Sequence, residues 1–154
     1  RQRQMCIRDR YGKTIGDMAR DVRAGYDLAA KSHPSIKGVI PVGEAWIRAM
    51  EVGLADNNSL DGIDAGKLNL WTYDNYHAST AGYYLKGLVV FGALTLKDPR
   101  SLGANECSGF ELGLSVSQVK ALQQVAYDQL IVSLPIQAAP LKNLDNEQPQ
   151  RCQR

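Results

Sequence analysis

Apolar residues recur at helical spacing in four stretches of the chain, and this pattern predicts four α-helices. Most of these stretches start at a residue suited to cap a helix or end close to a proline, which disfavours the α conformation in the residue before it. The predicted helices cover residues 15–31, 44–54, 80–96 and 115–134. The third is apolar on almost every side between Leu88 and Leu94, so we expect it to be the most buried element.

Two short segments have the pattern of β-strands. Residues 38–42 form a continuous apolar run, which is typical of a buried parallel strand. Residues 68–71 alternate between apolar and polar, which fits a short strand or a loop packed by its apolar side chains. Strands placed between helices predict an α/β fold that is helix-rich and has one or two short parallel strands. A complete α/β sheet needs more strands than these, so part of the sheet is expected to be missing.

Polar and irregular segments connect the predicted elements. The segment from Asp56 to Lys67 is rich in Asn, Asp and Gly and is predicted to be a surface loop. Residues 99–114 are predicted to form a second loop. His33 precedes a proline and is assigned to a loop, with no acidic or nucleophilic residue at a useful spacing.

The composition fits one globular domain rather than a disordered or fibrous chain. The chain has 154 residues, of which 44% are hydrophobic and 22% charged. The formal net charge is only +2, and several basic residues fall in the first ten positions, so no basic face for nucleic acid is indicated. The longest apolar run is far shorter than the roughly 20 residues that a membrane-spanning helix needs. We therefore expect no nucleic-acid partner and no membrane span, and the oligomeric state stays open.

The two ends of the chain differ from its middle. Residues 1–10 are rich in Arg and lack both an apolar period and the apolar core of a signal peptide. They resemble translated adapter sequence found in proteins from metagenomic assemblies, so we interpret them as an artefactual leader. Residues 135–154 show no period and are predicted to be a disordered tail, which leaves 11–134 as the domain. With the true N-terminus expected to be missing, a periplasmic or secreted location is only a guess.

The cysteines do not have the spacing of a metal site. Cys6, Cys107 and Cys152 form no CxxC pair and no Cys/His ligand pattern, so no zinc site is predicted. Cys107 and Cys152 either pair in an oxidising compartment or remain free thiols, and the sequence does not decide between these alternatives. No metal and no cofactor is predicted.

Catalytic chemistry, where the chain has any, is predicted at Asp74-x-x-His77, which follows a short aromatic run and precedes the third helix. An imidazole titrates near neutral pH and can take a proton from a weak nucleophile, so His77 is a candidate general base. A carboxylate bonded to the other ring nitrogen fixes the tautomer, and Asp74 has the spacing for that role. A bare Asp-x-x-His also occurs by chance as a structural turn pair, which is the alternative interpretation.

The block Asp74-Asn-Tyr-His77-Ala78-Ser79, followed by Gly82, resembles the last conserved block of the SGNH (GDSL-like) hydrolases. In that family the block reads Asp-x-x-His-Pro-Ser with a Gly a few residues on, so Ala78 replaces the usual Pro. Upstream, residues 39–46 resemble the strand-to-helix segment that precedes the block in a bacterial branch of the family. The resemblance implies a flavodoxin-like three-layer α/β fold, with Asp74 and His77 as two members of a Ser-His-Asp triad.

Other parts of the family pattern have no counterpart in the chain. The nucleophilic Ser of the family lies in a Gly-Asp-Ser block, and the nearest local match, Gly16-Asp17-Met18, has Met in its place. No Gly-x-Asn-Asp block is present to supply oxyanion donors. We therefore interpret the chain as the C-terminal part of a serine ester hydrolase, inactive by itself, whose parent acts on acetyl groups of a carbohydrate or on a small lipid ester. The alternative is a non-enzymatic helical domain for packing or partner binding.

Overall fold

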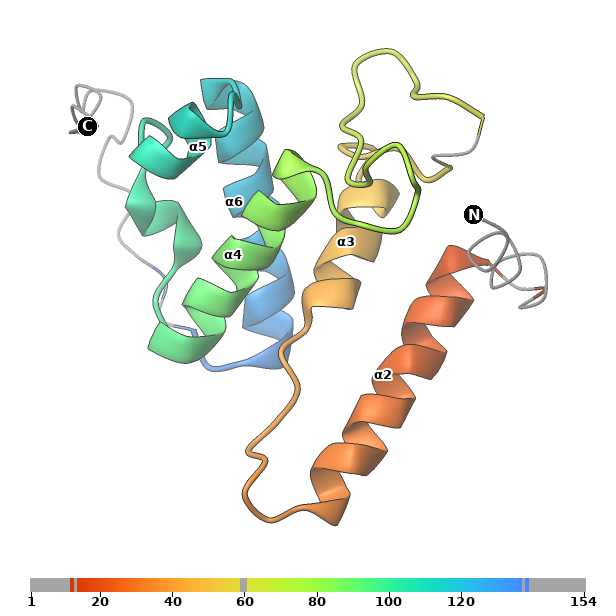
Figure 1. Ribbon diagram of the computed structural model, residues 1–154. Coiled ribbons are helices and arrows are strands. Elements are labelled where there is room, and N and C mark those ends of the chain that lie inside the picture. Colours follow the sequence, from red (N-terminus) through yellow and green to blue (C-terminus); the bar gives the residue numbers. More distant parts are fainter. Residues whose placement is uncertain (1–11, 13, 59–60, 137, 139–154) are drawn as a thin grey trace.

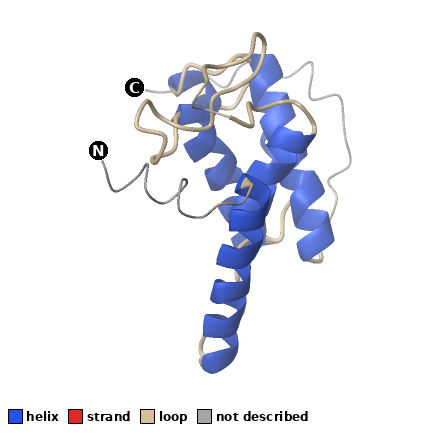
Figure 2. Ribbon diagram, turned by 90° about the vertical axis from the view of Figure 1, so that its right-hand side faces the viewer, coloured by secondary structure: helices blue, strands red, loops and turns tan. Residues whose placement is uncertain are grey.

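The computed structural model describes residues 12, 14–58, 61–136 and 138, and this part of the chain is helical (Figures 1 and 2). The predicted leader 1–10 and most of the predicted tail 135–154 lie outside the described residues. The elements in chain order are α2 (Ile15–Ser32), α3 (Val42–Glu51), α4 (Thr80–Thr95), the 3-10 helix η1 (Pro99–Leu102), α5 (Cys107–Glu111) and α6 (Val116–Ser133).

The predicted α/β fold is wrong, because the described residues contain no β-strand. Residues 38–41 of the apolar run are a linker without regular structure and Val42 is the first residue of α3, with Ile40 and Val42 packed against the core of the helices. Leu68 forms one isolated parallel bridge with Ala55 and continues into no ladder. A short apolar run is compatible with a strand or with a buried loop, and without a neighbouring strand to pair with it stays irregular. Neither a flavodoxin-like sheet nor three layers are present in this part of the chain.

The four predicted helices are present, and the local caps explain where three of them begin. Thr14 and Asp17 form the expected capping box before α2, and Ser115 and Gln118 form the one before α6. The Ser79 side chain accepts from the backbone N–H of Gly82 at the start of α4. The predicted loop 99–114 is wrong in part, because it contains η1 and α5, each too short to show a period in the sequence.

The core lies where α3, α4 and α6 meet. In Figure 1, α4 and α6 lie side by side in the body of the molecule. The segment that contains η1 and α5 connects the end of α4 to the start of α6. Helix α4 is well buried, with seven buried residues and Leu88 at 3% exposure, but it does not stand alone as the most buried element, because α6 also buries seven residues. The largest apolar side chains that are fully buried are Leu70, Leu85, Leu122, Leu130, Val89 and Val119.

Helix α2 packs differently from the other long helices. It projects from the body in both views, contacts α3 and contains no buried residue (Figures 1 and 2). Val22 and Tyr26, which recur at helical spacing along α2, are 52% and 61% exposed. Arg23 instead joins α2 to α3 through an ion pair with Glu44, so a polar flank of the helix faces α3.

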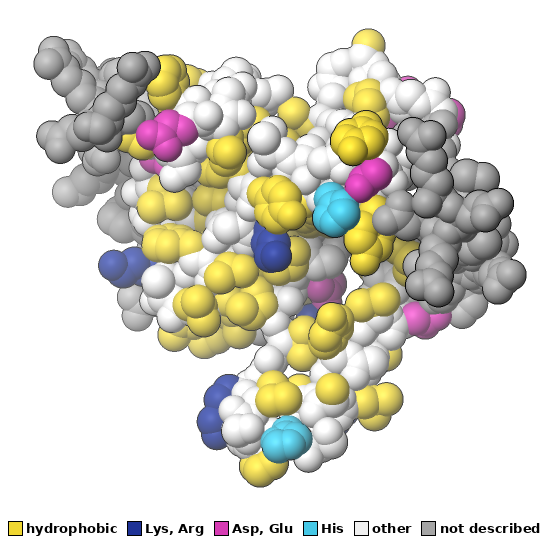
Figure 3. Space-filling view, in the orientation of Figure 1, with side chains coloured by type: hydrophobic (Ala, Val, Ile, Leu, Met, Phe, Trp, Pro, Cys, Tyr) yellow, Lys and Arg dark blue, Asp and Glu magenta, His cyan; other side chains and the backbone are white. Residues whose placement is uncertain are grey.

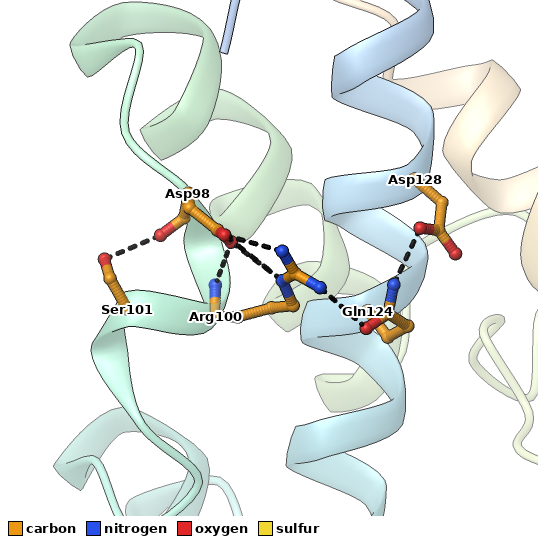
Figure 4. A network of polar contacts seen from close by, with 5 residues as sticks. All are labelled: Asp98, Arg100, Ser101, Gln124 and Asp128. Atoms are coloured by element: carbon orange, nitrogen blue, oxygen red, sulfur yellow. Dashed lines mark hydrogen bonds and ion pairs between the residues drawn. The ribbon is translucent and has the colours of Figure 1, made fainter. Parts of the chain in front are cut away.

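A buried ion pair holds η1 against α6 (Figure 4). The Asp98 carboxylate is fully buried and accepts from the backbone and side-chain N–H groups of Arg100. The Arg100 guanidinium also donates to Gln124 of α6 and lies 3.4 Å from the ring centre of Tyr127. A bidentate guanidinium–carboxylate contact is among the strongest polar contacts in proteins, so this network fixes η1 on the core.

Two further sequence predictions can be compared with the structure. Cys107, at the start of α5, is disulfide-bonded, so the free-thiol alternative is wrong for this residue; its partner lies outside the described residues. Of the helices that the structure describes, none combines the length and apolar character that crossing a bilayer requires.

Candidate acid–base site

The Asp-x-x-His segment folds as a tight loop between the core and the start of α4. Trp71 and Ala78 form an antiparallel bridge at its base, and the Thr72 backbone N–H donates to the His77 carbonyl over 2.8 Å. Asn75 at the tip has φ +54°, a left-handed conformation that Asn adopts more readily than most residues. The loop therefore brings the side chains at positions 74 and 77 to the same side.

Asp74 and His77 are hydrogen-bonded, as the spacing predicts. The His77 Nδ1 atom lies 2.6 Å from Asp74 Oδ2, and the two side chains are 60% and 25% exposed respectively. Asp74 Oδ1 accepts from the Thr72 hydroxyl and from the backbone N–H groups of Tyr76 and His77. The Thr72 hydroxyl first, and then the His77 ring and these backbone donors, hold the pKa of the Asp74 carboxyl well below its ordinary value.

This arrangement decides the tautomer of the neutral His77 ring. An ionised carboxylate can only accept hydrogen bonds, so Nδ1 must carry the proton that faces Asp74. The lone pair of a neutral imidazole then lies on Nε2, which makes no hydrogen bond to any described residue. The Tyr76 ring stands edge-on to the His77 ring, with 4.8 Å between centres and an angle of 89°. The ring is thus oriented by neighbours on the loop and presents Nε2 as a base.

The site lies on an exposed part of the surface. In Figure 3 a histidine and an acidic side chain adjoin over the loop before α4, among hydrophobic side chains. Tyr73 and Tyr76 of this loop are 97% and 54% exposed, so these two aromatic side chains are not part of the core. A groove of about 360 Å³ lies between α2 and α3, and its lining includes neither Asp74 nor His77.

The first turn of α4 packs closely against the base of the loop at Gly82. A Cβ at this position would lie 2.3 Å from the Leu70 carbonyl oxygen and 2.8 Å from the Trp46 ring. Trp46 in turn packs edge-on against Trp71, with 4.6 Å between ring centres. Only glycine therefore allows the first turn of α4 to approach the base of the loop this closely. The sequence identified Gly82 from the motif alone and gave no sign of the contact with Trp46.

Ser79, which belongs to the motif, and Ser101, which lies on η1, are engaged in structural contacts. The Ser79 hydroxyl donates to the Asn69 carbonyl and accepts from the Gly82 backbone N–H, so it caps α4. The Ser101 hydroxyl donates to the Asp98 carbonyl in the network of Figure 4. The described residues thus contain an Asp–His pair but no serine hydroxyl hydrogen-bonded to His77. They also contain no group of three or more side chains of the types that bind metal ions.

Comparisons of the chain with protein-family models, with curated proteins and with solved structures find no match. The resemblance to SGNH hydrolases therefore depends on the residues of the Asp74–Gly82 block alone, and the three-layer α/β fold that it implied is absent from the described residues.

Proposed function

We propose that Asp74 and His77 are the acid–base pair of a serine ester hydrolase. The observation that carries the proposal is the 2.6 Å contact between Asp74 Oδ2 and His77 Nδ1, which leaves Nε2 without a partner among the described residues. A general base needs a free lone pair, a fixed ring and an accessible position. His77 combines these three properties, and the SGNH resemblance of the surrounding block adds the reaction class.

In the proposed reaction, His77 Nε2 takes the proton from a serine hydroxyl as its oxygen attacks the ester carbonyl. The imidazolium that forms is stabilised by the Asp74 carboxylate, and it then returns the proton to the departing alkoxide. The hydroxyl and the donors that stabilise the oxyanion come from a segment outside the described residues. The expected substrate is an acetyl group on a carbohydrate or a small lipid ester, which follows from the family resemblance alone.

One observation favours the second candidate, a non-enzymatic helical domain in which the pair is structural. Asp74 Oδ1 accepts from the backbone N–H groups of Tyr76 and His77, and an Asp side chain makes such contacts in many turns without any catalytic role. This candidate explains the position of Asp74. It gives no reason for the partly exposed imidazole or for the bond at Nδ1.

An ester hydrolysis assay separates the two candidates. We expect the 154-residue chain to hydrolyse p-nitrophenyl acetate at the background rate, because no serine hydroxyl among the described residues is hydrogen-bonded to His77. A longer gene product that includes an upstream Gly-Asp-Ser segment should be active, and His77→Ala in that protein should lower the rate by several orders of magnitude. His33→Ala is the matched control and should leave the rate unchanged, since His33 lies in the loop after α2.

Two results would contradict the proposal. Equal activity with and without His77 in the longer protein would exclude His77 as the base. A gene that encodes no serine-bearing segment upstream would favour the non-enzymatic domain. Turnover by the 154-residue chain itself, lost in His77→Ala, would retain the base but show that a serine such as Ser79 or Ser101 is the nucleophile.

A further inference from the structure

Thr72 contacts both ends of the Asp-x-x-His turn. Its hydroxyl donates to Asp74 Oδ1 and lies 3.3 Å from the His77 carbonyl oxygen. Its backbone N–H donates to the same His77 carbonyl over 2.8 Å, and its own carbonyl accepts from the Asn75 N–H. Nothing in the sequence motif points to this residue, because it lies before the Asp and outside the block.

The two oxygens of Asp74 accept hydrogen bonds from different donors, and this keeps one of them directed at His77. Oδ1 accepts from the Thr72 hydroxyl and from two backbone N–H groups, while Oδ2 accepts from the His77 ring. A carboxylate held by one oxygen cannot rotate freely about its Cβ–Cγ bond without losing those bonds. The other oxygen therefore stays directed at Nδ1.

The donors to Oδ1 approach it from two directions. They are the backbone N–H groups of Tyr76 and His77 and the Thr72 hydroxyl. Both N–H groups follow Asp74 in the chain, so they approach the carboxylate from one end of the turn. Thr72 approaches from the strand-like segment before it and is the one side-chain donor to Oδ1 among the described residues.

We infer that Thr72 is a positioning residue, which directs Asp74 Oδ2 at His77 Nδ1 and so keeps the lone pair of the ring on Nε2. The inference deepens the proposed function, since a base with the proton on the wrong nitrogen cannot deprotonate a hydroxyl. The hydrogen-bond geometry can be tested without any catalytic activity. Failure of the inference is therefore distinguishable from failure of the proposed function.

The test is nuclear magnetic resonance of the histidine ring nitrogens in the full chain, at a pH where the rings are neutral. The ¹⁵N shifts of Nδ1 and Nε2 report which nitrogen carries the proton. His77 should show a protonated Nδ1 and an unprotonated Nε2. His33 is an internal reference, because its Nδ1 is hydrogen-bonded to the Ser35 hydroxyl at 3.4 Å and not to a carboxylate.

Thr72→Val removes the hydroxyl while keeping the branched shape, and it should move the two ¹⁵N shifts of His77 toward each other as the second tautomer becomes populated. Thr72→Ser retains the hydroxyl and should restore the wild-type shifts. Thr95→Val is the matched control, because the Thr95 hydroxyl bonds the Phe91 carbonyl within α4, away from the loop. It should leave His77 unchanged. Unchanged backbone amide shifts in the core verify that each variant is folded.

Asp74→Asn separates the possible failures. A shift of the His77 signals in Asp74→Asn but not in Thr72→Val would overturn the role of Thr72 and leave the Asp–His pair intact. No shift in either variant would mean that the pair is not formed in solution, which would remove the basis of the proposed function as well. A shift in Thr72→Val that Thr72→Ser fails to restore would assign the effect to packing and would also overturn the inference.

Discussion

Replacement of Gly82 by alanine tests whether the loop really depends on its close approach to α4. The added Cβ would lie 2.3 Å from the Leu70 carbonyl oxygen and 2.8 Å from the Trp46 ring, and a separation below 3.0 Å requires that something move. Both neighbours are held in place, since the Leu70 carbonyl accepts from the Ser79 N–H and Trp46 packs against Trp71.

The expected loss of stability is the cost of overpacking minus the gain in helix propensity. Overpacking a filled site costs about 1 to 3 kcal/mol, and the upper end applies where backbone atoms have to shift. Alanine gains up to about 1 kcal/mol over glycine inside a helix. We therefore expect Gly82→Ala to lower the free energy of unfolding by about 2 kcal/mol.

Gly87→Ala is the matched control for this prediction. It lies in the same helix, is exposed, and has no atom within 4 Å of its added Cβ, so only the propensity gain of up to about 1 kcal/mol remains. Urea denaturation followed by far-ultraviolet circular dichroism measures both variants. Faster amide hydrogen exchange at Ser79 in Gly82→Ala would locate the damage at the loop. A Gly82→Ala protein as stable as wild type, or stabilised like Gly87→Ala, would refute the reasoning.

Three more predictions follow from burial and charge. Leu88→Ala, at a site 3% exposed, should cost about 2 to 5 kcal/mol in urea denaturation, whereas Leu94→Ala, at 74% exposure, should change stability by about 0.5 kcal/mol or less; equal effects would place α4 at the periphery. Asp98→Asn leaves the Arg100 guanidinium without its buried partner and should cost about 3 kcal/mol in the same assay, and a loss below about 1 kcal/mol would show that the ion pair is dispensable. The lowered pKa of Asp74 means that its contribution to stability is present above the ordinary carboxyl pKa of about 3.9 and is lost as the pH falls through the lower pKa of the folded state. The difference in melting temperature between wild type and Asp74→Asn should therefore shrink as the pH falls below about 4, and a difference that grows over that acidic range would contradict this.

At the candidate site, the sequence alone predicted the contact between Asp74 and His77 but not the contacts that support it. The spacing of Asp74 and His77 sufficed to predict their hydrogen bond, because residues three apart in a turn lie on one side of the chain. Thr72 could not be identified in this way, because its contact with Asp74 depends on how the loop closes. Gly82 was recognised through a motif, while the reason for glycine there came from the Leu70 carbonyl and from Trp46, which lies on another helix.

The sequence by itself determined the four long helices, since periodic apolar positions and capping residues such as Thr14 and Ser115 act within a few residues. Only the tertiary structure decided what those elements pack against. Residues 38–42 have the apolar character of a strand, but strand formation requires a neighbour to pair with, and the described residues offer none. Helix α2 is amphipathic, yet its apolar face is exposed for a similar reason. A periodic pattern indicates which face of a helix can be buried, but that face is buried only where another surface covers it.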